Sequence, residues 1–462
     1  MRRKTESSAS SVSLNCVDKC LLALDSINEP MLFYVVVDLE GQIDHARLNE
    51  AIASAQQAHP VMKTIVRSRN LKLFREIQED LGKRVLSIVD QAQLAGTNEE
   101  SYLSSWMNQP LDIRKEFPVR ILLLQKNERE SSLVFTFHHS SADGLRGILF
   151  ARKVVESYNG DFSQDSKSTV AVDTAGKGDE LLEFARNQRS EVAHYYRKII
   201  WSLFRRFVIA ALPPPTRVFH DKSGRSRQLA FCLRTIGPEE LKEVQCKART
   251  AKVGLNDIFL AASHLAVEKW NTMYGKANKR IRVMVPVNIR PEGFCYSVSN
   301  HVSWCSFTST PRDRADSAKL LRKVRTDTTN AITNGIAFSL IYFFYVCSRF
   351  PLFVVREMAR FLMITRIYVD TILITNVGFA WSKTGSKEPA VSNMGNAKVL
   401  NVSGSAPVVT PMGVSIATCT YDKNLNLSLT YRPALLSKDK ARMFLDLYAE
   451  EIKNYQIGAQ GT

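Results

Sequence analysis

The stretch LVFTFHHSSADGLRGILFARKVV, residues 133–155, contains a strand pattern, a polar turn and a helix pattern in succession. Residues 133–137 are almost all β-branched or aromatic, which predicts a buried strand. In residues 145–155 the apolar side chains recur at helical spacing, which predicts a helix. The two histidines and the aspartate between these segments therefore occupy a strand-to-helix turn, where a side chain can face a cleft.

The histidines of this turn, His138 and His139, are adjacent, and adjacent residues on an extended chain point to opposite faces. We therefore expect one of them to be structural. A neutral imidazole has a pKa close enough to working pH to accept a proton from a hydroxyl or an amine. Asp143 could serve as a relay carboxylate or form a structural ion pair, and Gly144 allows a tight backbone path. This pattern favours general-base acyl transfer.

Two other chemistries use the same types of residue. Two histidines and an aspartate can bind zinc, but adjacent histidines rarely converge on one ion and the chain has no HExxH motif or CxxC pair. An acyl-enzyme on Ser140 or Ser141 needs the context Gly-x-Ser-x-Gly, which is absent around them. We therefore expect no metal and a direct transfer between two bound substrates.

The pattern His138-His139-x-x-x-Asp143-Gly144 resembles the HHxxxDG motif of the chloramphenicol-acetyltransferase-like acyltransferase superfamily. Its members include peptide-synthetase condensation domains, wax ester synthases, alcohol acetyltransferases and polyketide-associated acyltransferases. The resemblance implies an α/β fold with mixed sheets, in which two lobes form a pseudo-dimer with the active-site channel between them. It also implies that His139 is the general base, and that His138, Asp143 and Gly144 are structural residues at the active site.

Further stretches resemble the same superfamily in the same order along the chain: LEGQID (39–44), HPVMKT (59–64), PLDI (110–113), FPVR (117–120), LNDIFLAA (255–262) and VPVNIR (285–290). The resemblance implies that Arg290 holds Asp143. It also suggests that four residues shape the channel or contact substrate: Asn300, Thr375, Asn376 and Gly378. The plant-type DFGWG motif is absent, and no carrier, adenylation or ketosynthase module is expected within these 462 residues.

The length of 462 residues suits two lobes, each large enough for its own core. We predict a first lobe at residues 1–175, which carries the motif, and a second at 176–462. A polar stretch at 161–178 resembles a linker between them. We expect the protein to be a monomer.

The second lobe shows alternating helix and strand patterns. Strands are predicted at 227–234 and 282–287, helices at 238–252 and 255–269, and a hairpin at 413–420 and 425–431. Ser437 is predicted to cap the last helix.

The eight cysteines, at 16, 20, 232, 246, 296, 305, 347 and 419, lack the spacing of a zinc site and the density of a disulfide scaffold. The N-terminus is polar and lacks the apolar segment of a secretory signal. The apolar run 336–347 is too short to cross a membrane, so it is expected in the core or lining the channel. These features predict a cytoplasmic protein.

The net charge of +17 favours anionic partners such as phospholipid surfaces, coenzyme A phosphates or an acidic acyl-carrier protein. No nucleic-acid-binding motif is present, so nucleic acid is not an expected partner. Residues 181–207 form a basic amphipathic pattern that could lie on the inner membrane surface or pack on the second lobe, and both alternatives stay open.

The sequence therefore predicts an acyltransferase that moves an acyl group from acyl-CoA or an acyl-carrier protein to the hydroxyl of a hydrophobic acceptor. No cofactor is expected, since acyl-CoA or the phosphopantetheinyl carrier is a substrate. One alternative is a freestanding peptide-synthetase-type enzyme that condenses the acyl group with an amine to form an amide. The other is a catalytically idle module that binds carrier proteins or lipids.

Overall fold

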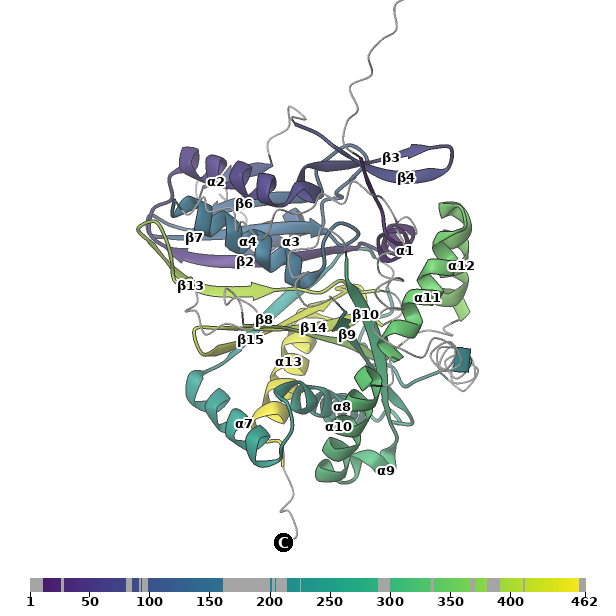
Figure 1. Ribbon diagram of the computed structural model, residues 1–462. Helices are drawn as coiled ribbons and strands as arrows, with labels where there is room; N and C mark the ends of the chain where they lie inside the picture. Colours follow the sequence, from purple (N-terminus) through teal and green to yellow (C-terminus); the bar gives the residue numbers. More distant parts are fainter. Residues whose placement is uncertain are drawn as a thin grey trace, which may run out of the picture.

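Strand β7 (Glu130–His138) and helix α4 (Gly144–Tyr158) form the strand-turn-helix unit that the sequence predicts. The structure is a computed structural model, shown in Figure 1. It describes residues 11–25, 29–79, 85–90, 93, 99–160, 200–201, 204, 214–224, 226–289, 300–333, 336–365, 370–379, 391–409 and 412–456. The fold is the two-lobed, mixed α/β fold that the sequence predicts. Each lobe is built around a six-stranded sheet (Figure 1).

The sheet of the first lobe has the strand order β12-β13-β2-β7-β6-β5. Strand β7 is antiparallel to both of its neighbours and lies inside the sheet. Because both faces of this central strand are covered, its apolar residues form an almost unbroken run instead of alternating with polar ones. The other strands are β2 (Leu32–Glu40), β5 (Leu86–Val89), β6 (Val119–Gln125), β12 (Asn393–Met394) and β13 (Ala397–Gly404).

Helices cover both faces of this sheet. Helices α2 (His45–Ala58) and α4 pack on one face, where Phe135 and Phe150 belong to one apolar core. Helix α3 (Glu99–Met107) packs on the other face through Trp106. A separate three-stranded sheet stands beside the lobe and consists of β1 (Ser11–Ser13), β3 (Thr64–Arg69), which follows the short helix η1 (Pro60–Lys63), and β4 (Lys72–Ile77).

The sheet of the second lobe has the strand order β10-β9-β11-β14-β15-β8. The predicted hairpin is present, and its turn is Asp422-Lys423, both with positive φ angles of 43° and 64°. Two such residues give the tight turn whose twist matches that of the paired strands. The strands are β8 (Ala230–Ile236), β9 (Ile281–Asn288), β10 (Val302–Ser309), β11 (Ile372–Phe379), β14 (Val414–Tyr421) and β15 (Asn424–Tyr431).

The helices predicted for the second lobe are also present, and α1 joins their core although it lies near the start of the chain. The helices are α1 (Cys16–Asp25), α7 (Pro238–Thr250), α8 (Leu255–Met273), α9 (Pro311–Arg314), α10 (Ser317–Thr333), α11 (Ile336–Ser348), α12 (Leu352–Thr365) and α13 (Lys438–Lys453). Ser437 stands at the N-cap of α13, but its hydroxyl donates to Asp221 at 2.6 Å instead of capping the helix.

A segment from late in the chain belongs to the sheet of the first lobe. Strands β12 and β13 come late in the chain, yet they extend the first lobe's sheet, where β13 pairs with β2. The side chain of Asn426 in β15 donates to the Asn401 side chain at 2.6 Å and to the Val402 carbonyl at 2.9 Å, which ties β13 to the second sheet. The predicted boundary at 175/176 lies outside the described residues.

The apolar run that the sequence assigns to the core or the channel forms α11, which packs between α1 and α10 in the second lobe. Within the described ranges, no helix is both long and apolar enough to span a bilayer.

Candidate active site

His139 follows the last residue of β7 and is fixed by its backbone and its ring. Its N–H donates to the Met31 carbonyl at 2.7 Å, and its ring lies edge-on to Phe33 at 5.3 Å between centroids. Burial lowers the pKa of His139 below its usual value, although Asp143 acts in the opposite direction. The buried Nδ1 has no hydrogen-bond partner among the described residues. The residue is partly exposed although its Nδ1 is buried. The lowered pKa keeps the imidazole neutral at neutral pH, the form that can accept a proton.

His138 is buried and makes contacts that hold the turn. Its Nδ1 lies 2.8 Å from the hydroxyl oxygen of Ser140, and its Nε2 lies 3.5 Å from a carboxylate oxygen of Asp25. Burial opposes ionisation of Asp25, but His138 and the Met31 backbone N–H hold the pKa of this carboxyl below its usual range. Ser140 has no exposed surface, so an acyl group from solvent cannot reach its hydroxyl. This arrangement stabilises the turn.

Asp143 caps the helix that follows the turn. One carboxylate oxygen accepts from the Arg146 backbone N–H at 3.1 Å, and the other accepts from the His301 N–H at 3.3 Å. The carboxylate thus accepts hydrogen bonds from one backbone N–H at the N-terminus of α4 and from one in the second lobe. The predicted contact with Arg290 lies outside the described residues.

Gly144 lies where the two lobes approach each other. A Cβ atom at this position would lie 3.3 Å from Cγ1 of Val377 in β11. Val377 also packs against the first lobe's core. The TNVG stretch, residues 375–378, therefore meets the motif through this valine.

Beneath the turn lies a buried polar network that sequence reasoning did not identify. Arg75 of β4 forms an ion pair of 2.9 Å with Asp18 of α1, and it also donates to the Ser140 carbonyl. The Asn300 side-chain nitrogen donates to Asp18 at 2.7 Å and to the His139 carbonyl at 2.8 Å. Arg75, Asp18 and Asn300 are at most 1% exposed. They connect the turn to β4, to α1 and to the segment just before β10, all distant in the sequence.

The sequence contained a weak signal for this network. Asp18 is a buried acidic residue in the first turn of α1, between the buried Val17 and Cys20, and buried acids require partners. Its partner is 57 residues away in a separate sheet, so no local pattern links the two.

The residues assigned to a channel differ in their placement. The Asn300 side chain is buried and supports the turn through its hydrogen bond to the His139 carbonyl, and its predicted contact with the channel stays a prediction. The Asn376 side chain donates to Asn256 at 2.6 Å and accepts from the Gly378 N–H at 2.8 Å, which shapes the end of β11. Gly378 has a φ of 72°, which suits glycine. The Thr375 carbonyl accepts from Thr418 at 3.4 Å.

Within the described ranges, no three His, Cys, Asp or Glu side chains are grouped as metal ligands. The seven described cysteines are free, and Cys246 is the exposed one among them. Burial raises the pKa of Cys16 to about 12 and also raises that of Cys20, so these thiols are poor nucleophiles.

Comparison with known proteins identifies the family. The chain matches the condensation-domain family model over residues 27–341, which is more than half of its length. It is 25% identical over 151 residues to CymA, a probable non-canonical nonribosomal peptide synthetase of Salinispora arenicola (strain CNS-205). That match covers 32% of this chain and 2% of CymA, so the chain corresponds to a small part of that synthetase.

Solved structures share the fold. The first condensation domain of the calcium-dependent antibiotic synthetase, in complex with a substrate analogue, has a TM-score of 0.69 and 13% identity, covering 96% of this chain and 97% of that one. The starter condensation domain of rhizomide synthetase RzmA, in complex with C8-CoA and Leu-SNAC, has a TM-score of 0.64 and 12% identity, covering 98% and 97%. The chain belongs to the condensation-domain family, within the chloramphenicol-acetyltransferase-like superfamily that the motif indicates.

Proposed function

We propose that this chain transfers an acyl group from a thioester to an amine or a hydroxyl, with His139 as the general base. The observation that carries the proposal is the imidazole of His139, which has a lowered pKa and belongs to a partly exposed residue directly after β7. Its backbone is held by Met31 and Asn300, so the ring has a fixed place at the end of β7.

In the proposed step, the acceptor nitrogen or oxygen attacks the thioester carbonyl carbon while His139 takes the acceptor's proton. The tetrahedral intermediate then collapses, the carbon–sulfur bond breaks, and the departing sulfur takes up the proton from the imidazolium. General-base assistance contributes about a hundred- to ten-thousand-fold, and alignment of the two substrates supplies much of the remainder. The burial of Ser140 supports direct transfer without an acyl-enzyme.

Family membership favours an amine acceptor and an amide product, which was the first alternative in the prediction from the sequence. A hydroxyl acceptor, which the sequence ranked first, stays as the second candidate because an apolar pocket in the second lobe would suit a hydrophobic acceptor. For the donor, the charge of +17 suits both coenzyme A and an acidic carrier protein. The starter domain of rhizomide synthetase was solved in complex with C8-CoA, which supports testing acyl-CoA as a donor.

The test is incubation of the purified chain with acyl-CoA or loaded carrier-protein donors and a panel of amines and alcohols. Thiol release and product mass are read together, so an amide and an ester are distinguished directly. The His139→Ala variant should lose at least a hundredfold in turnover while keeping its circular dichroism spectrum. Near-wild-type turnover in this variant would refute the assignment, and the absence of product from every pair would favour an idle binding module.

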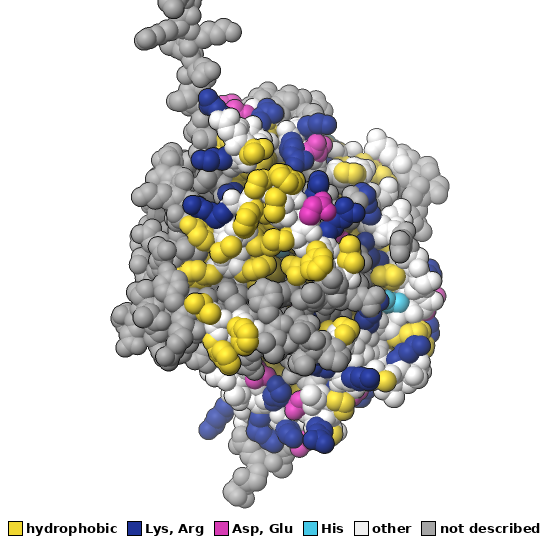
Figure 2. All heavy atoms as spheres, turned by 90° about the vertical axis from the view of Figure 1, so that its right-hand side faces the viewer, with side chains coloured by type: hydrophobic (Ala, Val, Ile, Leu, Met, Phe, Trp, Pro, Cys, Tyr) yellow, Lys and Arg dark blue, Asp and Glu magenta, His cyan; other side chains and the backbone are white. Residues whose placement is uncertain are grey.

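We also propose peripheral contact with an anionic membrane. On the face where α11 and α12 lie, hydrophobic side chains gather with Lys and Arg around them (Figure 2). Phe353, Phe361 and Ile364 of α12 are 58%, 60% and 75% exposed, beside Arg356 and Arg360. Exposed aromatic residues next to arginines suit the interfacial region of such a bilayer.

Most of the predicted amphipathic helix at 181–207 lies outside the described residues. The described Trp201 and Phe204 of that segment are 63% and 56% exposed, which supports the membrane alternative at these two positions. The predicted cytoplasmic location stays a prediction.

A further inference from the structure

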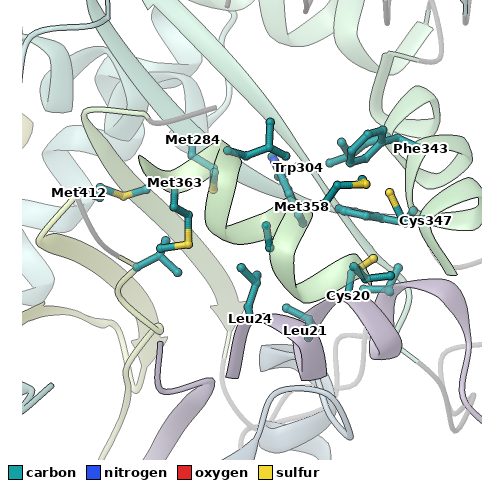
Figure 3. A pocket seen from close by; sticks show the side chains of 17 residues that line it. Cys20, Leu21, Leu24, Met284, Trp304, Phe343, Cys347, Met358, Met363 and Met412 are labelled. Atoms are coloured by element: carbon teal, nitrogen blue, oxygen red, sulfur yellow. The ribbon is translucent and has the colours of Figure 1, made fainter. Parts of the chain in front are cut away.

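A partly open cavity of about 170 Å³ lies in the second lobe, lined by α1, α11, α12, strands β9 and β10, and by Val409 and Met412 ahead of β14 (Figure 3). Its walls are almost entirely apolar. Figure 3 shows that α12 contributes Met358 and Met363, while Met284 and Trp304 project from the sheet. This space is distinct from the turn that carries His139, and neither the motif nor the buried Asp18 network uses it.

The lining chemistry selects an apolar ligand. An apolar cavity offers no hydrogen bonds to water, so it stays dry and gains free energy when a hydrocarbon group fills it. A cavity of about 150 Å³ holds one benzene-sized ligand, so this one suits about six to eight carbon atoms. Four of its lining residues are methionines, whose unbranched side chains adapt to ligands of different shape.

The cavity adjoins the candidate active site through α1. Val17, Cys20 and Leu24 of this helix line the cavity at helical spacing. The next residue after Val17 is Asp18, which holds the Asn300 amide beneath the His139 turn. Trp304 lines the cavity from β10, shortly after Asn300 in the chain. A group bound in the cavity therefore lies against the same helix that supports the proposed base.

Helix α12 covers the cavity with one face and meets solvent with the other. Val355 and Leu362 line the cavity, whereas Phe353 and Phe361 are exposed. Because the two faces belong to one helix, a substitution can change one face and leave the other intact.

We propose that this cavity binds the hydrocarbon part, an alkyl or aromatic group of about six to eight carbon atoms, of an amphiphilic ligand. The assignment of that ligand as a substrate of acyl transfer rests on the proposed function, whereas the binding itself does not.

Binding is tested by the fluorescence of Trp304 in the full chain. The probes are 8-bromooctanoic acid and 8-bromooctan-1-ol, because bromine quenches indole fluorescence on contact. Both should give saturable quenching whatever the head group, and Trp304→Phe should lose most of it. Ala359→Phe fills the cavity and should raise the apparent dissociation constant at least tenfold. The matched variant Phe361→Ser, on the outer face of α12, should bind as the wild type does.

Linear, non-saturable quenching, or saturation that is unchanged in Ala359→Phe, would overturn the proposal. Thermal melting of each variant checks folding, and Leu21→Phe is a second cavity-filling change on α1 if Ala359→Phe fails to fold. The His139→Ala variant should still bind both probes. Binding without turnover would therefore refute the proposed function alone, and turnover without saturable binding would refute the cavity assignment alone.

Discussion

The side-chain amide of Asn300 donates a hydrogen bond of 2.8 Å to the backbone carbonyl of His139. The same nitrogen donates to Asp18 at 2.7 Å, and the backbone carbonyl of Asn300 accepts from Asn15 at 2.9 Å. The proposed base is therefore positioned by residues that lie outside the motif in the sequence.

Asn300→Ala should lower kcat about ten- to a hundredfold and change KM little. The variant leaves the His139 carbonyl without this donor and releases the turn, while a misplaced base slows the chemical step more than binding. Steady-state kinetics with the best substrate pair from the panel measures both constants. Asn454→Ala, at an exposed site after α13, is the matched control and should behave as wild type. An unchanged kcat in Asn300→Ala would show that the amide does not position the base.

Arg75→Met should destabilise the fold by about 3–5 kcal/mol, because it leaves Asp18 buried without its ion-pair partner. Urea unfolding measures the free energy. The double variant Asp18→Leu/Arg75→Met removes both charges and should lose less than the sum of the two single variants. Strictly additive losses would mean that the two side chains do not depend on each other.

Local patterns predicted the strand and helix on either side of the HHxxxDG turn, because burial and helical spacing act within a few residues. The hairpin at Asp422-Lys423 was predicted for the same reason. The placement of β13 in the first lobe's sheet and the Arg75–Asp18 pair were not, since both depend on contacts between distant segments. The support that Asn300 gives to the turn was not predicted either, because its partners lie in distant segments.

Gly147→Ala should lower kcat and destabilise the fold by about 1–3 kcal/mol. A Cβ atom at this position would lie 2.6 Å from Cε2 of Phe33, whose ring contacts the His139 imidazole. The added methyl group must therefore displace the neighbour of the proposed base. Kinetics and urea unfolding measure the two effects.

Two variants test this explanation of the Gly147 effect. Phe33→Leu combined with Gly147→Ala should recover part of the lost stability by making room for the methyl group. Gly237→Ala, where a Cβ atom would meet nothing within 4 Å, should leave kcat unchanged. A Gly147→Ala enzyme with full activity would mean that the Phe33 contact does not orient the ring.

With an acceptor that does not itself titrate between pH 5 and 9, such as an alcohol or an arylamine, the rate of acyl transfer should fall on the acidic side of the pH profile and be flat above about pH 7. The base works when neutral, and burial lowers the pKa of His139 below the ordinary 6.5, so protonation removes activity only below that pH. The measurement is kcat/KM between pH 5 and 9, with circular dichroism at each pH to confirm that the chain stays folded. An acid limb with a midpoint above pH 7 would contradict a buried, neutral base.

The outer face of α12 should bind vesicles that contain anionic phospholipid. Sedimentation with phosphatidylcholine vesicles, with and without phosphatidylglycerol, measures the partition coefficient, and added salt should weaken it by screening Arg356 and Arg360. Glu357 lies 2.9 Å from Arg356 and 3.6 Å from Arg360, so the charge of this face is partly neutralised and apolar insertion must supply much of the affinity.

The triple variant Phe353→Ser/Phe361→Ser/Ile364→Ser should therefore reduce partitioning more than tenfold, because each of these side chains gains about 1.5–3 kcal/mol when fully buried. Ala359→Phe changes the inner face of the same helix and should partition as the wild type does. Equal partitioning of the triple variant and the wild type would exclude this face as the membrane contact. The predicted amphipathic helix at 181–207, with its exposed Trp201 and Phe204, would then be the next surface to alter.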